Sequence, residues 1–357
     1  MRTGIIGFPR VGKTSLFKIL THAHVEEHGR GEAHIGVARV ADPRLDELAK
    51  VIKPKKVTHA TIEYVDVGGV LKDVERDTAR LAQLREVEAL AHVVRLFRDD
   101  SIPHAPGEIN PLRDIENVEL ELMLADLDMA TRRLEKIERE LRKHSTAELE
   151  HEQAVLTKCQ ETLEAQRPLR EVEFSEEEQR TIRGYMFLSA KPMLCVMNLG
   201  DEEAAETDQV VAKHGLDAIT EKRATAVTAI CGKIETELAE LPDEEAAEFL
   251  ASYGLKDSGL DRLIHATHGL LGLLSFFTVN ERECRAWTVP QGTTAVRAAG
   301  VVHTDMERGF IRAEVIRWDD LVTLGSMAAA REKGKILVEG KEFVVRDGDV
   351  LYFRHSG

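Results

Sequence analysis

Long apolar runs, paired cysteines and aromatic residues are all scarce in this chain of 357 residues. The longest nearly apolar stretch, GLLGLLSFFTV at residues 269–279, is too short to span a bilayer and is predicted to form the end of a core helix. The four cysteines lie far apart and form no pair motif, which favours reduced thiols in a cytoplasmic protein. The N-terminus is not expected to be a signal peptide, because its short apolar run leads directly into a glycine turn. No membrane partner is therefore expected.

An excess of positive charge is also absent, since Asp and Glu outnumber Lys and Arg by 63 to 48 and the formal net charge is −15. A surface of that sign does not wrap nucleic acid as a whole, so no DNA partner is expected, although one domain can still carry a local basic patch. The apolar fraction of 43% and the charged fraction of 31% are those of an ordinary soluble globular protein. The length suffices for two or three domains.

The first motif that is present is GFPRVGKT at residues 7–14, which has the spacing of a phosphate-binding loop. An apolar run precedes it, as in a buried strand, and the apolar spacing of residues 16–20 fits the buried face of a helix. The free N–H groups and the dipole at such a helix start favour an anion. Lys13 can reach the β- and γ-phosphates, and the Thr14 hydroxyl can ligate Mg²⁺. The predicted nucleotide contacts of the loop are Arg10, Val11, Gly12, Lys13, Thr14 and Ser15.

Two further motifs follow predicted strands, as they do in GTPases. In Asp66-Val67-Gly68-Gly69, Asp66 can hold Mg²⁺ through water, and the N–H of Gly69 can approach the γ-phosphate. In Asn198-Leu199-Gly200-Asp201, the Asp stands where GTPases read the ring N–H and the exocyclic amine of guanine. An ionised Asp201 would disfavour adenine, which offers an acceptor at that place. The alternative reading of this second motif is a polar turn after a strand.

The order of predicted elements indicates an α/β fold. Strands and helices alternate over residues 1–110, which argues for a mostly parallel sheet with crossover helices, and sheet-like sequence returns at residues 191–200 and 224–233. Between them lies a highly charged segment that is predicted to form an antiparallel helical hairpin ending near residue 185. Its two apolar stripes are predicted to be Leu120, Leu124, Leu127, Leu134, Ile137 and Leu141 on one helix, and Leu149, Leu156, Cys159 and Leu163 on the other.

After residue 273 the sequence becomes rich in predicted strands separated by turn signals such as PQG, EGK and RDGD. A small β-rich domain is therefore expected. The predicted strands are ECRAWTV, AVRAAGVV, GFIRAEVI, KILV, KEFVV and VLYFRH. A local basic patch on this domain could consist of Arg285, Arg297, Arg308, Arg312 and Arg317, the alternative being dispersed surface charge.

Together these motifs resemble the YchF subfamily of Obg-like ATPases, P-loop proteins of the GTPase superfamily, nearly end to end. The matching stretches include GFPRVGKTSLF, DPRLDELAKVIKP, YVDVGG, NPLRDIENVELELMLADLD, HTDMERGFIRAEVI and VRDGDVLYFR. The resemblance implies a GTPase-like domain at residues 1–114 and 186–273, an inserted coiled-coil hairpin at 115–185, and a C-terminal β-grasp (TGS, ubiquitin-like) domain at 274–357. It also implies Mg²⁺ with ATP, a cytoplasmic location and a role at the ribosome in translation or stress, with the TGS domain and the hairpin facing the ribosome or its RNA.

The resemblance also assigns the catalytic residues. GTPases position the attacking water with a Gln after Asp-x-x-Gly, but this chain has Val70 there. The family is thought to use a His from a mobile loop instead, and DDSIPHAPGEINPL places that role on His104 beside the catalytic Lys13. The alternative is a solvent-facing loop histidine.

Three departures from the family pattern bear on activity. Asp201 stands where the family has Glu, so a GTP-binding member is the alternative to ATP. Arg30 stands where the first switch has a Thr, and VLKDVERDTARL replaces a glycine-rich second switch. Slow turnover is therefore expected, with Arg30 supplying charge where the Thr is missing. A His-rich metal site formed by His22, His24, His28 and His34 is a lesser alternative to a polar switch loop.

Three functions remain open from the sequence. The first is a slow nucleoside triphosphatase that acts as a switch. The second is a nucleotide-gated binding module with negligible hydrolysis, which the altered switches favour. The third is a P-loop kinase for a small substrate, against which the Asn198 motif and Asp66-x-x-Gly69 argue. The oligomeric state and the identity of the partner are not encoded in any pattern found.

Overall fold

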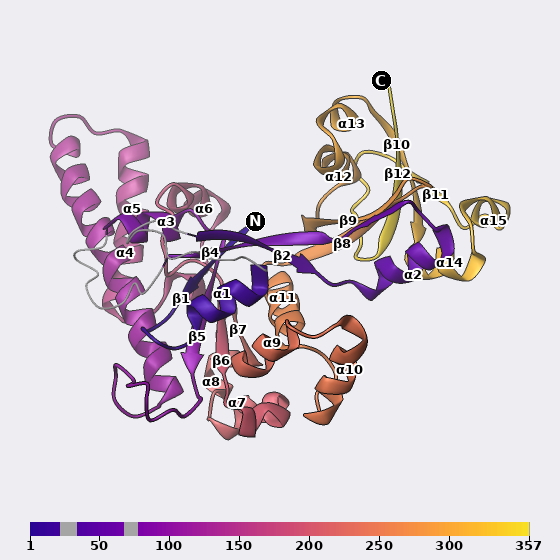
Figure 1. The fold of residues 1–357 in the computed structure, drawn as a ribbon. Helices are drawn as coiled ribbons and strands as arrows, with labels where there is room; N and C mark the ends of the chain where they lie inside the picture. Colours follow the sequence, from indigo (N-terminus) through magenta and orange to yellow (C-terminus); the bar gives the residue numbers. More distant parts are fainter. Residues whose placement is uncertain (22–33, 68–77, 357) are drawn as a thin grey trace. The chain divides into compact units, whose positions relative to one another are not determined.

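The computed structural model describes residues 1–21, 34–67 and 78–356, and divides into two compact units (Figure 1). Unit 1 comprises residues 1–37 and 63–270, and unit 2 comprises residues 38–62 and 271–357. Within the part of the chain that the structure describes, every helix is too short or too polar to cross a bilayer. All four cysteines are buried and free, as expected for reduced thiols.

Unit 1 is built around a six-stranded sheet with the strand order of a P-loop protein. In the sheet, β1 lies between β4 and β5, and the pairs β1–β4, β1–β5, β5–β6 and β6–β7 are all parallel. This confirms the predicted mostly parallel sheet. The strands, in order across the sheet, are β2 (His34–Val40), β4 (Ala60–Asp66), β1 (Arg2–Ile6), β5 (Ala89–Arg95), β6 (Met193–Asn198) and β7 (Thr225–Ile230).

Helices connect these strands and bury their apolar sides against the sheet. β5 and β6 are buried along their whole length, which explains their continuous apolar sequence. The helices of this part are α1 (Lys13–Thr21), α3 (Thr78–Arg85), α7 (Val210–Lys213), α8 (Asp217–Thr220), α9 (Gly232–Leu238), α10 (Asp243–Ser252) and α11 (Gly259–Leu270), with the 3₁₀ helix η3 (Asp201–Gln209).

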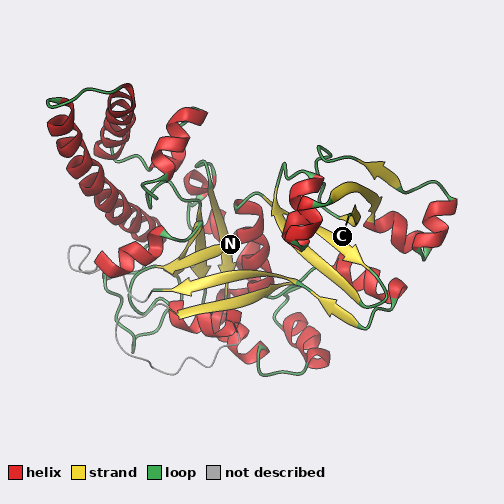
Figure 2. Cartoon of the chain, turned by 90° about the horizontal axis from the view of Figure 1, so that it is seen from above, coloured by secondary structure: helices red, strands yellow, loops and turns green. Residues whose placement is uncertain are grey.

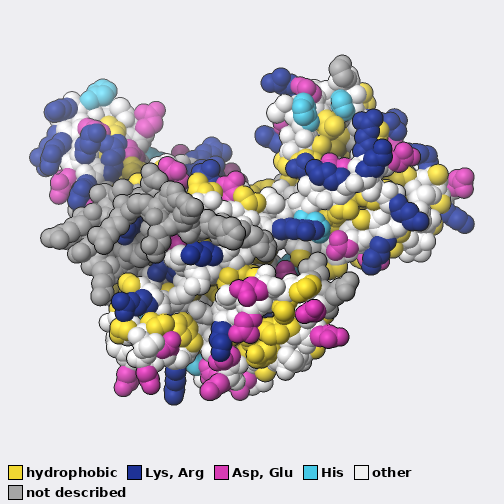
Figure 3. All heavy atoms as spheres, in the orientation of Figure 1, with side chains coloured by type: hydrophobic (Ala, Val, Ile, Leu, Met, Phe, Trp, Pro, Cys, Tyr) yellow, Lys and Arg dark blue, Asp and Glu magenta, His cyan; other side chains and the backbone are white. Residues whose placement is uncertain are grey.

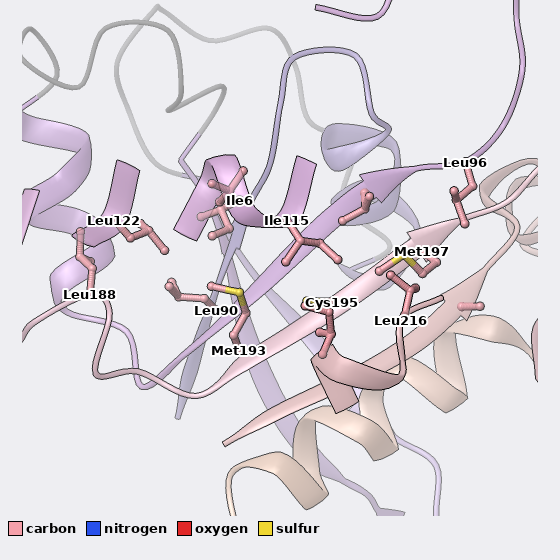
Figure 4. Packing of buried hydrophobic residues seen from close by; sticks show 14 of the residues in the cluster. Ile6, Leu90, Leu96, Ile115, Leu122, Leu188, Met193, Cys195, Met197 and Leu216 are labelled. Carbon is pink, nitrogen blue, oxygen red and sulfur yellow. The ribbon is translucent and has the colours of Figure 1, made fainter. Parts of the chain in front are cut away.

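The predicted hairpin is formed by α4 (Pro111–Leu141) and α5 (Ala147–Glu164), which project together from the sheet (Figure 2). Asn110 caps α4 by accepting a hydrogen bond from the N–H of Arg113, and Thr146 caps α5. The base of α4 packs on β5 and β6 through Ile115 and Leu122 (Figure 4). The chain returns to the sheet through η2 (Leu169–Glu171) and α6 (Glu176–Arg183).

The predicted apolar stripe of α4 is partly wrong. Leu120 and Leu124 are 37% and 48% exposed, whereas Asp126 and Ala130 are fully buried. The start of α4 packs on the sheet, and its later turns pack on α5. The buried face therefore includes the small residue Ala130 and the ion-paired Asp126 as well as leucines. The stripe of α5 holds, since Leu156, Cys159 and Leu163 are buried and Leu149 is partly buried.

Unit 2 contains a second six-stranded sheet, of mixed direction, with β-grasp order in its centre. β8 pairs antiparallel with β9 and parallel with β12, which in turn pairs antiparallel with β10. The first and last strands of the domain therefore lie side by side, as the expected β-grasp fold requires. The elements are β8 (Leu273–Val279), β9 (Glu283–Pro290), α12 (Ala295–Val302), α13 (Thr304–Arg308), β10 (Phe310–Arg317), α14 (Trp318–Leu324), α15 (Met327–Glu332), β11 (Leu337–Glu339) and β12 (Asp349–His355).

Three segments of unit 2 have a different secondary structure from the predicted one. AVRAAGVV is helix α12, because alanines at 295, 298 and 299 favour a helix and form its buried face. LLSFFTV in the apolar run 269–279 is strand β8, because its aromatic and β-branched residues fit a buried strand. KEFVV contributes only an isolated bridge between Val344 and Thr294.

Residues 38–62 group with the C-terminal unit, which differs from the predicted domain limits. This segment includes α2 (Pro43–Ile52), which buries Leu45 and Leu48, and β3 (Lys56–Thr58), which adds to the second sheet beside β9. The guanidinium of Arg44 on α2 pairs with Asp347 at 2.5 Å. The segment therefore completes the core and the sheet edge of unit 2.

Candidate nucleotide-binding site

The loop between β1 and α1 has a backbone that only particular residues can adopt. Gly7 has φ 138° and Gly12 has φ 103°, both in the region that side chains disfavour, and Arg10 adopts φ 64°. A Cβ on Gly7 would lie 2.4 Å from the carbonyl oxygen of Val93, which leaves no space for a side chain. The two glycines of the motif are therefore required by the fold of the loop as well as by its predicted ligand.

Lys13 starts α1 and turns back over this loop. Its buried Nζ donates hydrogen bonds to the carbonyl oxygens of Gly7 at 2.9 Å and Phe8 at 2.6 Å. Burial lowers the pKa of Lys13 to about 8, an effect that the nearby carboxylate of Asp66 opposes. The site thus holds a desolvated cation at a helix N-terminus, which favours an anion.

Thr14 and Asp66 lie next to each other at the same end of the sheet. Asp66 ends β4 opposite Ile5 of β1, and the Thr14 hydroxyl donates to Asp66 Oδ2 at 3.2 Å. Oxygen donors of this kind suit Mg²⁺, which retains several of its waters in protein sites. Among the described residues, no group of three or more His, Cys, Asp or Glu side chains forms a metal cluster.

The side chain of Asn198 connects the phosphate loop to the start of α9. Its Nδ2 donates to the carbonyl oxygen of Val11 at 2.9 Å, and its Oδ1 accepts from the N–H of Gly232 at 3.0 Å. A Cβ on Gly12 would lie 2.5 Å from this Nδ2. The buried amide therefore fixes the distance between the phosphate loop and the Cys231–Gly232 turn. Leu199 is buried beside it.

Asp201 differs from Asn198 because it is exposed. Its carboxylate accepts a hydrogen bond from Nζ of Lys233, which lowers the pKa of Asp201. Asp201 also borders a cavity of about 550 Å³ formed at the ends of β5 and β6 and the start of α4. The residues that line the cavity are Leu96, Phe97, Arg98, Ile109, Pro111, Gly200, Asp201, Glu202, Glu203 and His214.

His104 is not the solvent-facing residue that its loop composition suggested. Its side chain is only 4% exposed, and its Nε2 lies 2.7 Å from Oδ2 of Asp114 in the first turn of α4. Its ring packs edge-on against Phe8 of the phosphate loop, with ring centroids 6.4 Å apart. The structure therefore places His104 beside the phosphate loop but bonded to the helical hairpin.

Two buried polar side chains of this region were not predicted from the sequence. His92 on β5 is fully buried close to Gly7, and burial lowers its pKa to about 3, with a further lowering by Lys13. Arg170 forms a buried ion pair with Glu119 of α4, and burial lowers the pKa of Arg170 to about 10. No local motif marks these residues, because their partners come from distant parts of the chain.

Several predicted residues lie outside the described residues: Gly69, Val70, Arg30, His22, His24 and His28. His34, the remaining histidine of that cluster, begins β2 and stacks obliquely near Phe17.

Comparisons with known proteins agree with this geometry. A family model described as a 50S ribosome-binding GTPase matches residues 2–158, and the model of the C-terminal domain of YchF GTPases, described as a protein of unknown function, matches residues 273–356. The Bacillus subtilis ribosome-binding ATPase YchF is 40% identical over 366 residues, covering 100% of this chain and 99% of the relative. The Pasteurella multocida ribosome-binding ATPase YchF is 39% identical over 363 residues, with 99% of each covered.

A solved structure extends the similarity to the fold. The Schizosaccharomyces pombe YchF GTPase superposes with a TM-score of 0.85 at 29% identity, covering 99% of this chain and 97% of that one.

Proposed function

The chain, matched along its whole length by curated relatives, belongs to the YchF family, and on that premise we propose that it binds ATP, hydrolyses it slowly and acts as a nucleotide-dependent switch on the ribosome. The observation that carries the proposal is the geometry around the phosphate loop. Buried Lys13 and the hydrogen-bonded pair of Thr14 and Asp66 lie at one end of the sheet, and Asn198 donates a hydrogen bond to the loop there. The relatives are called ribosome-binding ATPases, which supports both the nucleotide and the partner. A cytoplasmic location follows from that partner.

In this proposal the loop residues Arg10 to Ser15 surround the phosphates, and Lys13 stabilises their charge as an ammonium group. Thr14 binds Mg²⁺ directly, and Asp66 binds it through water. The metal would neutralise charge on the β- and γ-phosphates, while Gly69 donates its N–H to the γ-phosphate. The loop backbone fixes the positions of Lys13 and Thr14, and the end of β4 fixes that of Asp66.

His104 orients the attacking water in this proposal, because the chain has Val70 where other GTPases have Gln. The test is steady-state ATP turnover with Mg²⁺ by the purified protein and by His104→Ala, with His265→Ala, an exposed histidine on α11, as the matched control. We expect His104→Ala to lower kcat at least tenfold and to leave the KM for ATP nearly unchanged. Equal and appreciable turnover by all three proteins would contradict the role of His104. Turnover by all three no faster than that without protein would favour the second candidate, a nucleotide-gated binding module, which the bond between His104 and Asp114 supports.

ATP is the proposed nucleotide, with GTP as the alternative. The bond from Lys233 to Asp201 occupies part of the carboxylate that would read guanine. The amide of Asn198 is bonded to Val11 and Gly232, and nothing in its arrangement excludes adenine. Competition between ATP and GTP for one site separates the two possibilities.

The ribosome-facing surfaces are proposed to be the far end of the hairpin and the β-grasp domain. Figure 3 shows Lys and Arg side chains gathered on the hairpin, and its exposed basic residues there are Arg132, Lys136, Arg139, Arg142 and Lys143. On unit 2, Arg312 lies opposite Arg354 in the β10–β12 pair, and Arg354 stacks on Tyr352. Arg297 and Arg308 lie on α12 and α13 instead, so the five arginines named from sequence do not form one face of the sheet.

A further inference from the structure

The side chain of His104 is bonded to α4 rather than to the phosphate site. Its Nε2 lies 2.7 Å from Asp114 Oδ2, and the two side chains are 4% and 2% exposed. An ionised carboxylate accepts hydrogen bonds but does not donate them, so Nε2 carries the hydrogen. His104 Nδ1 is buried and has no hydrogen-bond partner among the described residues. In this arrangement Nε2 is occupied by Asp114, and Nδ1 is closed off from solvent.

Hydrogen bonds from two arginine side chains hold both ends of the loop that carries His104. Buried Arg95 at the end of β5 donates to the carbonyl oxygens of Phe97 at 3.0 Å, Asp99 at 3.1 Å and Ile102 at 2.8 Å. On the other side, Arg113 donates to the carbonyl oxygen of Glu108 at 2.6 Å. These bonds involve the main chain of the loop, whereas Asp114 accepts its bond from the side chain of His104. The loop backbone can therefore stay in place while the imidazole turns.

The imidazole of His104 lies beside the phosphate loop. The imidazole of His104 already touches the ring of Phe8, whose carbonyl oxygen accepts a hydrogen bond from Lys13 Nζ at 2.6 Å. Rotation of the His104 side chain away from Asp114 would free Nε2 beside the site where the γ-phosphate is proposed to lie. The bond to Asp114 and a bond to an attacking water exclude each other, since both use the same N–H.

The negative charge of Asp114 is balanced by Arg113 even without His104. Its Oδ1 accepts from Nε of Arg113 at 3.0 Å and from Nη2 at 2.8 Å. The carboxylate thus remains paired when the imidazole leaves. Further along α4, Glu119 and Asp126 form buried ion pairs with Arg170 and Arg85, so the helix that carries Asp114 is held firmly against the core.

We propose that Asp114 is a positioning residue that withdraws His104 from the attacking water and thereby keeps ATP turnover slow. The inference rests on the proposed function, in which His104 orients that water. It differs from a role of Asp114 in activating His104, because such a role would require the imidazole to be bonded to Asp114 while a ring nitrogen faces the water.

The experiment compares ATP turnover by wild type, Asp114→Asn and Asp114→Ala, each alone and combined with His104→Ala. Asn keeps the shape of Asp and removes its charge, and Ala removes the hydrogen bond completely. Glu116→Gln, an exposed carboxylate on the same helix, is the matched control for loss of one negative charge. Thermal unfolding of each variant shows whether it is folded. We expect kcat to rise at least threefold in Asp114→Asn and more in Asp114→Ala, with the KM for ATP unchanged and no rise in the His104→Ala background.

A kcat that falls or stays constant in both folded Asp114 variants overturns the proposal, as does a rise that persists without His104. Loss of activity in His104→Ala is measured separately and tests the proposed function itself. A readout without nucleotide accompanies the kinetics: the ring ¹⁵N–¹H signal of His104 should be protected from exchange in wild type and exposed in Asp114→Ala. An unprotected signal in wild type would also overturn the proposal, whatever the turnover rates.

Discussion

The phosphate end and the base end of the site are built in different ways. At the phosphate end, Gly7 and Gly12 have backbone angles that side chains disfavour, and Lys13 is buried with two hydrogen bonds to the loop. At the base end, Asp201 is an exposed side chain whose partner, Lys233, is exposed as well. Recognition of phosphate therefore depends on the fold itself, whereas choice of base depends on side chains that can change without affecting the core.

The largest expected effect comes from the phosphate end. Lys13→Ala removes the desolvated cation that faces the phosphates, so we expect ATP affinity to fall by about a thousandfold, on the order of 4 kcal/mol. Lys18→Ala removes an exposed lysine from the same helix and should leave the affinity nearly unchanged. Equilibrium binding of a fluorescent ATP analogue with Mg²⁺ measures both, and similar affinities for the two variants would contradict the proposed role of Lys13.

The buried state of Lys13 also predicts a pH effect on the stability of the nucleotide-free protein. Its pKa is about 8, against 10.5 for an ordinary lysine, because burial disfavours the charged form. Between these values the unfolded chain binds a proton that the native state has lost, so this group makes stability rise with pH by up to about 3 kcal/mol.

Urea unfolding of wild type and Lys13→Met between pH 7 and pH 10.5 isolates this contribution. The free energy of unfolding of wild type should increase relative to that of the variant as pH rises above 8. A constant difference across that range would mean that Lys13 titrates at its ordinary pKa.

The sequence was informative where function depends on local spacing. Lys13 and Thr14 belong to one eight-residue motif, and a strand followed by Asn198 could be recognised from a short apolar run. The pairing of His104 with Asp114 could not, although the two are ten residues apart, because it depends on how the intervening loop is tied to Arg95 and Arg113. Loop composition predicts exposure, and only the tertiary bonds show that the histidine is buried.

The same difference between local patterns and long-range contacts explains the errors in the predicted fold. Leucine spacing predicted the buried face of α4 only in part, because Asp126 is buried by a distant partner, Arg85, that no local pattern contains. The helix α2 was assigned to the nucleotide domain because it follows β2 in an alternating pattern. Its apolar face, with Leu45 and Leu48, is instead buried in unit 2, which depends on long-range contacts with the C-terminal sheet.

A smaller effect is expected at Asn198, which joins the two ends of the site. Asn198→Asp replaces the Nδ2 donor by an oxygen that faces the carbonyl of Val11, now 2.9 Å from Nδ2. Loss of this buried hydrogen bond should cost about 1–3 kcal/mol, lowering the affinities for ATP and GTP by about tenfold each and lowering Tm. Isothermal titration with both nucleotides tests this prediction. A loss confined to one nucleotide would mean that Asn198 acts on the base directly and does not position the phosphate loop.

The smallest effect is expected at Asp201, and it should alter only the ratio of the two affinities. Asp201→Asn replaces one of the two acceptor oxygens that would receive the guanine ring N–H and exocyclic amine by an NH₂ donor, so GTP affinity should fall by about fivefold relative to ATP, on the order of 1 kcal/mol. Lys233→Ala frees the carboxylate and should shift the ratio toward GTP. Asp208→Asn, an exposed carboxylate on the same 3₁₀ helix, is the matched control. If Asp201→Asn leaves the ratio unchanged, base choice rests on Asn198 and the backbone of Leu199. If wild type prefers GTP and Asp201→Glu reverses that preference, one exposed side chain has made this chain a GTP-binding member of its family, while the buried phosphate end has stayed the same.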